Sequence, residues 1–327
     1  MSILVCGGAG YVGAHTVAEL IKTGKDVVVI DNLLTGHKAA VDKNARFYNG
    51  DIRDKDILFK IFKENDIDGV VHFAASSLVG ESMGKPLEYF NNNVYGLQIL
   101  LECMKAFAIN KMVFSSTCAV YGTPKKVPIT EDTETNPESC YGETKLTMEK
   151  MMKWVALAHG IRYISLRYFN AAGASFDASI GEDHSPETHL IPLVLQAASG
   201  KRESISIFGS DYDTPDGTCI RDYIHVTDLA DAHIKALDYL DNGNESGIFN
   251  LGSGKGYSVK EIIDIAENIS GNTIKKVFAD KRAGDPARLV AARDKAKKYL
   301  GWEPKYNIKD IIETAWLWHK NNPDGFC

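Results

Sequence analysis

The sequence lacks an excess of positive charge and any long apolar run. Its 37 Lys and Arg residues are outnumbered by 43 Asp and Glu residues, which gives a formal net charge of -6. An acidic chain is not drawn generally to nucleic acid or to anionic membrane surfaces, so any phosphate binding must be local. No apolar run approaches the length that spans a bilayer. We therefore expect neither nucleic acid nor a membrane among its partners.

Paired cysteines and a leader segment are also missing. The six cysteines are scattered, without a Cys-x-x-Cys pair or the clustering of small secreted domains. Met1 leads directly into an apolar segment, without the basic region and long apolar stretch of a secretory signal. We expect reduced thiols and a cytoplasmic location.

Strand-like and helix-like patterns alternate through the first half of the chain. Apolar strand patterns and the helix patterns between them cover 2–7, 11–23, 27–30, 45–48, 57–62, 70–75, 97–106 and 112–116. Strands that alternate with helices indicate a doubly wound parallel sheet with its ligand at the carboxyl ends of the strands. We predict an α/β fold: a Rossmann-like doubly wound parallel sheet with a smaller mixed α/β substrate-binding domain.

A glycine cluster joins the first predicted strand to the first predicted helix. Residues 7–13 contain the spacing Gly-x-Gly-x-x-Gly. Glycines allow a tight turn and a close approach to a pyrophosphate, whose charge then lies at a helix N-terminus. Asp31 ends the next strand, at roughly the twenty-residue separation where a carboxylate accepts from both hydroxyls of an adenine ribose. A carboxylate there repels a 2′-phosphate, which predicts NAD as the cofactor in place of NADP.

Tyr141 and Lys145 are four residues apart in a segment rich in helix formers. On a helix they share one face. We expect Lys145 to stabilise the Tyr141 phenolate and to lower its pKa from about 10 toward neutrality, which would make Tyr141 a general base. Tyr121 and Lys125 have the same spacing, but a glycine and a proline between them oppose a helix.

Thr117 follows the strand pattern at 112–116. Because the carboxyl ends of parallel strands meet at one edge, its hydroxyl is expected in the same crevice as Tyr141. A hydroxyl there can donate to or accept from a substrate oxygen.

The chain resembles the extended short-chain dehydrogenase/reductase family, and within it the enzymes that invert C4 of UDP-hexoses. The matching runs span nearly the whole chain: 7–13, 31–33, 50–53, 72–75, 79–82, 85–89, 92–94, 115–122, 141–145, 167–170, 217–226 and 282–285. The resemblance implies that a permanently held NAD takes hydride from C4 while Tyr141 takes the hydroxyl proton. A 4-keto sugar then turns over, and hydride returns to its opposite face. UDP-galactose and UDP-glucose are the implied substrates, and a homodimer is the implied assembly.

The resemblance also implies the binding residues. Lys145 would hold the nicotinamide ribose, and Thr117 would share the hydrogen bond to the reacting oxygen. The implied cofactor contacts are Gly7, Gly10, Tyr11, Val12, Asp31, Asn32, Asp51, Ile52, Phe73, Ala74, Asn92, Ser115, Tyr141, Lys145 and Tyr168. The implied substrate contacts, with both arginines on the diphosphate, are Thr117, Asn170, Leu190, Ser206, Phe208, Arg221, Tyr223, Arg282 and Asp285.

Two positions depart from the family pattern, and a third leaves the choice of substrate open. Ser77 stands where many relatives carry a lysine near the cofactor, and His189 stands where they often have asparagine. Leu289 occupies the position whose bulk is associated with admitting or excluding an N-acetyl group. Epimerisation of UDP-N-acetylglucosamine, alone or beside UDP-glucose, therefore stays open.

Two other functions use the same scaffold. A dehydratase needs an acid and a base just after Thr117, where Cys118 and Ala119 stand. A catalytically silent, NAD-sensing scaffold protein would need neither Tyr141 nor Lys145. Both comparisons favour epimerisation.

The alternation of strands and helices ends after Asn170. We expect an NAD-binding domain over 1–170 and a UDP-sugar-binding domain over 171–327, with some of the later chain returning to the first domain. A further strand is expected at 248–252, and helices are expected at 259–269 and 308–318. The loop after Asn170 contains potential metal ligands, but their order does not match a zinc helix motif, so we expect no metal. These ligands are Glu182, Asp183, His184 and His189.

Overall fold

The computed structural model of the chain describes residues 1–282 and 284–326. Ala283, within the 282–285 run, and Cys327, one of the six cysteines, lie outside the described residues. Seven parallel strands form the larger sheet, in the order β10-β6-β5-β4-β1-β2-β3. Their bounds are β1 Ser2–Cys6, β2 Asp26–Asp31, β3 Arg46–Asn49, β4 Ile67–His72, β5 Lys111–Thr117, β6 Arg162–Tyr168 and β10 Gly247–Leu251. The predicted Rossmann-like parallel sheet is confirmed.

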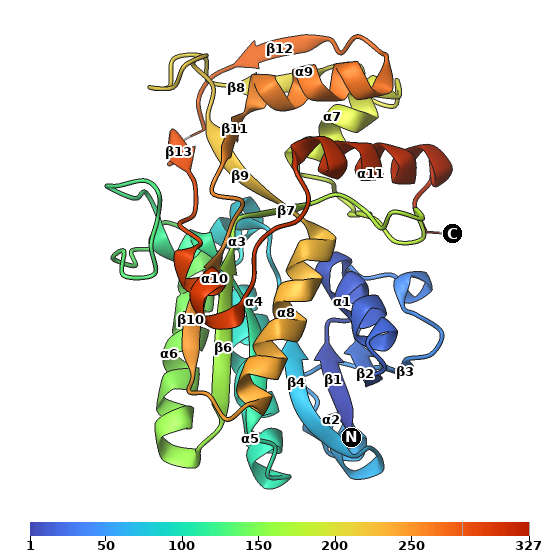
Figure 1. Cartoon of the computed structure of the whole chain (residues 1–327), viewed down its shortest axis with the longest axis vertical. Helices are drawn as coiled ribbons and strands as arrows, with labels where there is room; N and C mark the ends of the chain where they lie inside the picture. Colours follow the sequence, from blue (N-terminus) through green and yellow to red (C-terminus); the bar gives the residue numbers. More distant parts are fainter. Residues whose placement is uncertain (283, 327) are drawn as a thin grey trace.

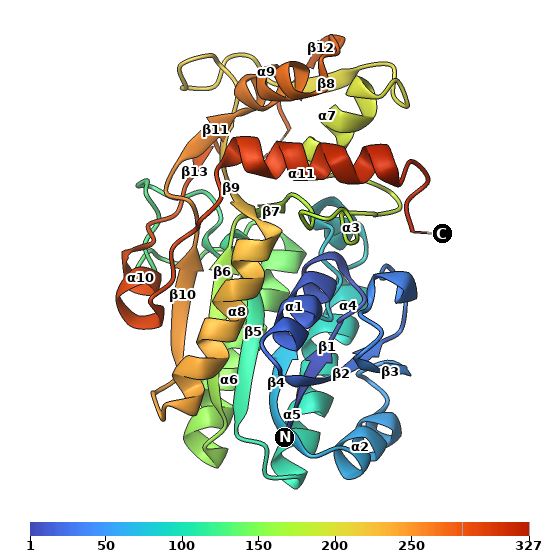
Figure 2. The same ribbon diagram turned by 45° about the vertical axis from the view of Figure 1, so that its right-hand side comes forward.

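Helices cover both faces of this sheet (Figure 1, Figure 2). One face carries α1 (Tyr11–Lys22) and α8 (Val226–Asp241), and the other carries α2 (Lys55–Glu64), α5 (Gly96–Ala106) and α6 (Cys140–His159). Each face of the sheet packs against its helices in a separate hydrophobic core. Successive residues of β1 point into opposite cores, since Leu4 packs in one and Val5 in the other. A strand buried on both faces therefore reads as a continuous apolar run.

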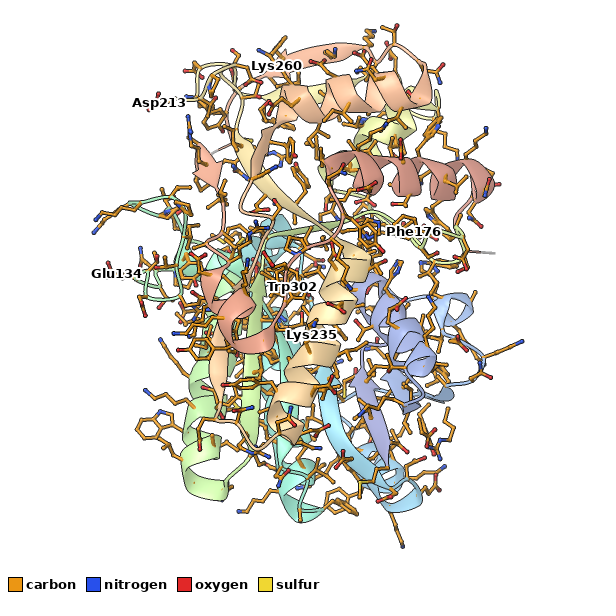
Figure 3. The ribbon with its side chains drawn as sticks, viewed as in Figure 1. Glu134, Phe176, Asp213, Lys235, Lys260 and Trp302 are labelled. Carbon is orange, nitrogen blue, oxygen red and sulfur yellow. The ribbon has the colours of Figure 1, made fainter. Side chains whose placement is uncertain are left out.

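Parts of the second half of the sequence belong to this first layer. Strand β10 pairs with β6 at the edge of the sheet, and α8 packs against α1. After α10 (Asp294–Leu300), the indole N–H of the buried Trp302 donates to the Asp228 carbonyl oxygen in α8 at 2.9 Å (Figure 3). Neither β6 nor α8 was predicted from the sequence. The division at residue 170, with later chain returning, stays a prediction.

The second part of the fold lies beyond the carboxyl ends of the main strands (Figure 1). Its central strand β9 (Ile220–His225) pairs with β7 (Asn170–Ala172), β11 (Gly256–Ser258) and β13 (Arg288–Leu289). Strands β8 (Ile205–Phe208) and β12 (Lys276–Ala279) form a separate pair. The helices around them are α7 (Leu190–Ala198), α9 (Val259–Ser270) and α11 (Ile308–Asn321). Parallel strands thus direct their ends toward a mixed α/β layer.

Short helical turns complete the structure. They are η1 (Lys38–Ala40), α3 (Val79–Gly84), α4 (Pro86–Tyr89), η2 (Phe90–Tyr95) and η3 (Cys118–Tyr121). Among the helices formed by residues 1–282 and 284–326, none combines the length and apolar character needed to cross a membrane.

Candidate active site

The loop between β1 and α1 is shaped by its glycines. Gly7 has a φ of +79°, and a Cβ atom at Gly13 would lie 2.1 Å from the Gly7 carbonyl oxygen. Helix α1 begins behind Gly10, which has no side chain to cap it, and its first turn holds no acidic residue. The N–H groups of this helix end are therefore free to receive phosphate oxygens. The geometry fits the pyrophosphate of a dinucleotide.

Asp31 ends β2 beside this loop. Its carboxylate oxygens accept from the N–H groups of Ala9 at 3.0 Å and Leu33 at 2.8 Å. Burial raises the pKa of Asp31, and the two N–H groups oppose that rise. The amide of Asn32, the next residue after Asp31, donates at 3.0 Å to Asp51, which follows the neighbouring strand β3. These predicted adenosine contacts thus lie together, and their roles stay predictions.

Tyr141 and Lys145 lie on one face of α6. The Ser139 hydroxyl caps the first turn of this helix. Lys145 Nζ lies 5.9 Å from the centre of the Tyr141 ring and donates to the Ser115 carbonyl oxygen at 2.7 Å. Lys145 is 2% exposed, and burial lowers its pKa to about 7, with Glu149 acting in the opposite direction.

The expected lowering of the Tyr141 pKa is wrong for the chain by itself. Burial raises the pKa of Tyr141, Tyr168 acts in the same direction, and the Thr117 hydroxyl opposes them. Lys145 cannot supply a full positive charge near neutral pH, because its own burial favours the neutral amine. Formation of the phenolate therefore needs another positive charge near Tyr141.

The ends of β5 and β6 place further hydroxyls next to this pair. Thr117 and Tyr168 are partners in the register of the two strands. The Ser115 and Tyr168 hydroxyl oxygens are 2.5 Å apart, and Thr117 Oγ1 accepts from the Ala119 N–H at 3.1 Å. The hydroxyl, phenol and amine groups predicted for catalysis therefore meet at the carboxyl ends of the central strands.

The segment before α5 forms a widened π turn that the sequence did not predict. Asn92 donates to the Ser76 hydroxyl at 3.2 Å. The buried Asn93 donates to the Ser76 carbonyl oxygen at 3.1 Å and to the Thr144 hydroxyl at 3.0 Å, which ties this turn to α6. Such turns are frequent at functional sites. Asn93 was missed as a positioning residue, although it ends a visible run of three asparagines.

The remaining predicted cofactor residues lie along the same edge. Phe73 and Ala74 follow β4, and the Phe73 ring lies 4.6 Å from the His233 ring. Val12 is in the first turn of α1, and Ile52 follows β3. The Tyr11 hydroxyl donates to the Gly173 carbonyl oxygen at 2.6 Å and so joins the glycine loop to the second half of the chain.

Apart from Thr117 on β5, the predicted substrate residues lie in the second part of the fold. Arg221 on β9 forms an ion pair with Asp285. The guanidinium carbon of Arg282 lies 4.0 Å from the centre of the Phe208 ring. The Asn170 amide donates to the Asp222 carbonyl oxygen at 2.9 Å. The others are Leu190 at the start of α7, Ser206 on β8 and the buried Tyr223 on β9. The structure joins Arg221 to Asp285 and Arg282 to Phe208, while ligand contacts stay predictions.

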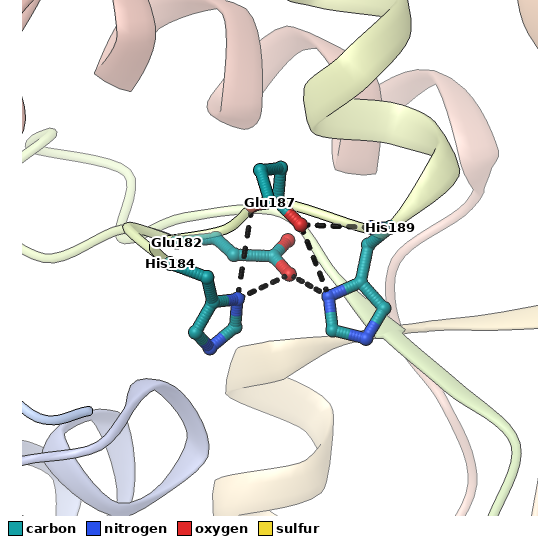
Figure 4. Close-up of side chains that lie close together, drawn as sticks. All are labelled: Glu182, His184, Glu187 and His189. Carbon is teal, nitrogen blue, oxygen red and sulfur yellow. Dashed lines mark hydrogen bonds and ion pairs between the residues drawn. The ribbon is translucent and has the colours of Figure 1, made fainter. Parts of the chain in front are cut away.

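A loop between β7 and α7 gathers two glutamates and two histidines, each with one nitrogen or oxygen atom within 4.8 Å of the others: Glu182, His184, Glu187 and His189 (Figure 4). Three of these were predicted from the sequence as potential metal ligands together with Asp183, and Glu187 was not. Asp183 instead accepts from the Phe326 backbone N–H at 2.9 Å. Convergence within one irregular loop depends on its backbone path, which has no periodic signal in the sequence.

Known proteins share both the sequence and the fold. The sequence model of the NAD dependent epimerase/dehydratase family matches residues 3–252. The chain belongs to this family. A member of the epimerase/dehydratase family from Lacticaseibacillus casei, a UDP-glucose 4-epimerase, is 56% identical over 100% of this chain and 99% of its own length.

Solved structures extend the family likeness to the whole molecule. A crystal structure of a UDP-glucose 4-epimerase matches with a TM-score of 0.99 at 57% identity, covering 100% of both chains. The UDP-glucose 4-epimerase from Bifidobacterium longum, solved in complex with NAD+ and UDP, matches with a TM-score of 0.94 at 40% identity, again over 100% of both chains. Because these matches cover the whole chain, the smaller second layer is also shared with these structures.

Proposed function

We propose that the protein interconverts UDP-galactose and UDP-glucose and holds NAD as its cofactor. The observation that carries the proposal is the meeting of Tyr141, Lys145 and Thr117 at the ends of the central strands, on the same edge as the glycine loop. The relative from Lacticaseibacillus casei, 56% identical over its length, supports this activity.

Tyr141 acts on the hydroxyl group at C4 of the sugar. When bound, NAD+ supplies a hydride acceptor and a positive charge that favours the Tyr141 phenolate. The phenolate oxygen takes the proton of the 4-hydroxyl group, and Thr117 donates to the same sugar oxygen. Tyr141 holds this proton while the sugar is a ketone and returns it after the sugar has turned over. The sugar loses and regains one proton at the oxygen and one hydride at C4, so the reaction has no net oxidation.

Lys145 contributes to the site mainly by holding groups in position, and less through a positive charge on its amine. The Ser115 carbonyl oxygen holds its Nζ at 2.7 Å, and the face of the Phe114 ring lies 4.8 Å from it. A buried amine fixed in this way can donate to a ribose hydroxyl from a constant position. On the substrate side, Arg221 would exchange part of its pairing with Asp285 for the diphosphate, as guanidinium groups bind such oxygens in bidentate fashion.

Product analysis tests the proposed reaction. Purified protein is incubated with UDP-galactose without added NAD, and sugar nucleotides are separated by anion-exchange chromatography and identified by proton NMR. We expect UDP-glucose to accumulate to equilibrium. Absence of product from protein shown to carry NAD would contradict the proposal. Equal or faster turnover of UDP-N-acetylglucosamine in the same assay would change the preferred substrate and leave the chemistry intact.

We further propose that the protein is a cytoplasmic homodimer formed through helices of the first domain. On α6, Trp154 is 69% exposed and Leu157 is 72% exposed, three residues apart on one helix face. Grouped apolar side chains on a surface commonly mark a protein contact. Light scattering should show a dimer that Trp154→Glu converts to a monomer. Leu34→Glu, at a loop residue that is 76% exposed, should leave the dimer intact.

A further inference from the structure

Glu182, His184, Glu187 and His189 converge around one point (Figure 4). His189 Nδ1 lies 2.6 Å from Glu182 Oε1 and 3.4 Å from Glu187 Oε1. His184 Nδ1 lies 3.3 Å from Glu182 Oε1 and 3.7 Å from Glu187 Oε2. Ligands bound to a tetrahedral zinc ion at about 2.0–2.1 Å lie about 3.3–3.4 Å from one another. Three of the four separations are within a few tenths of an ångström of that spacing.

The histidines and glutamates of this cluster form close ion pairs, but two buried atoms among them lack a hydrogen-bond partner. Glu182 is 4% exposed, and its Oε1 has no hydrogen-bond partner among the described residues. The same holds for the buried Nδ1 of His184. His189 Nδ1 approaches Glu182 Oε1 to 2.6 Å as an ion pair, so a metal ion would replace the proton that this pair shares. Buried polar atoms normally have partners, so these atoms point to a ligand between them.

We propose that Glu182, His184, Glu187 and His189 bind one divalent transition-metal ion, with zinc as the preferred ion. Two imidazole nitrogens and two carboxylate oxygens are ligands that zinc accepts in tetrahedral geometry. Two glutamates and two neutral imidazoles carry two negative charges, which a divalent ion neutralises. Four protein ligands leave no open coordination position, so the ion has a structural role.

The ion would fix the loop that connects the cofactor side to the substrate side. His189 directly precedes Leu190, the first residue of α7 and a predicted substrate contact. On the other side, the His184 ring lies 6.2 Å from the ring of Tyr11 in the glycine loop. A pocket of about 290 Å³, also lined by Gln196, Lys201 and Trp318, opens onto the cluster and gives the ion a route in and out.

Zinc retention by the full-length protein with its NAD tests this proposal. The protein is treated with EDTA, desalted and titrated with zinc chloride by calorimetry, and retained metal is measured by mass spectrometry. We expect one zinc per chain and a higher thermal midpoint with zinc than without. His189→Gln and Glu182→Gln should lose this zinc. His159→Gln, which changes an exposed histidine at the end of α6, should retain it.

Two results would overturn the proposal. One is wild-type protein that retains no zinc when it is loaded with zinc chloride and then desalted again, and the other is His189→Gln that retains as much zinc as the wild type after the same treatment. A comparison without metal separates ligand loss from misfolding, because metal-free His189→Gln should still unfold in one cooperative transition, although at a lower temperature than metal-free wild type, since it lacks the ion pair with Glu182. Should that variant not fold, Glu187→Gln provides the same test at a ligand that is only partly buried.

Discussion

The Lys145 amine lies 5.9 Å from the centre of the Tyr141 ring, and its hydrogen bond goes to the Ser115 carbonyl oxygen at 2.7 Å. The pair shares a helix face, but burial affects the two groups oppositely. It lowers the pKa of Lys145 to about 7 and raises the pKa of Tyr141. Lys145 therefore positions groups around the phenol, and we expect the positive charge of bound NAD+ to favour the phenolate.

Lys145 should give the stability of the cofactor-free protein a pH dependence. Its pKa is lower in the folded than in the unfolded state, so the unfolded state binds more protons between pH 7 and pH 10. Over this window the wild type should gain stability relative to Lys145→Met, by at most about 1.4 kcal/mol per pH unit. Urea denaturation at each pH measures the difference. A difference in stability that stays constant from pH 7 to pH 10 would show that the pKa of the Lys145 amine is not lowered in the folded state.

Two glycines of the first loop should respond differently to alanine. At Gly13 the new Cβ would lie 2.1 Å from a backbone oxygen, so the loop must shift; at Gly10 the nearest atom is 3.5 Å away. Gly13→Ala should lower both the thermal midpoint and the NAD content. Gly10→Ala should keep the thermal midpoint of the cofactor-free protein and lose NAD, because its methyl group enters the phosphate space. Full NAD content in Gly10→Ala, measured by absorbance after acid release, would exclude this loop as the pyrophosphate site.

Leu289 should set the preference between UDP-hexoses with and without an N-acetyl group. It is half-buried on β13 and pairs in register with Arg221. Leu289→Gly should raise turnover of UDP-N-acetylglucosamine relative to UDP-galactose by about tenfold or more, since pocket contacts of this size discriminate over that range. Val290→Ala, at the next residue along the chain, should leave the ratio unchanged. An equal ratio in Leu289→Gly and wild type would place the selecting contact elsewhere.

Local patterns were enough to predict the first half of the fold. Buried parallel strands read as apolar runs, and α1 and α5 lie within one residue of their predicted ends. Helix α8 and strand β6 were not predicted. In the structure His225 caps the start of α8, where its ring nitrogen accepts from the Thr227 N–H at 3.1 Å. The return of β10 to the sheet is a long-range pairing, and its partner β6 is not identified by anything in its own sequence.

The placement of candidate site residues could be predicted where they follow strands, and the pKa of Tyr141 could not be predicted, because burial decides it. Thr117 and Tyr168 come together because the register of β5 and β6 aligns them. The pKa of Tyr141 depends on how completely α6 and its neighbours exclude water, which spacing alone cannot give. Glu187 joined the histidine cluster through the path of an irregular loop.

A comparison of Tyr141 with Tyr121 tests most directly whether Tyr141 is the general base. Tyr121 has the same spacing to a lysine, but it is buried, donates to Asn250 at 2.8 Å, and its Lys125 is exposed. Turnover of UDP-galactose and bound NAD are measured for Tyr141→Phe and Tyr121→Phe. We predict that Tyr141→Phe keeps its NAD and loses turnover by about 10²–10⁴-fold, the range for removal of a general base. Tyr121→Phe should lose stability and keep its turnover. Turnover near the wild-type value in Tyr141→Phe would contradict the account.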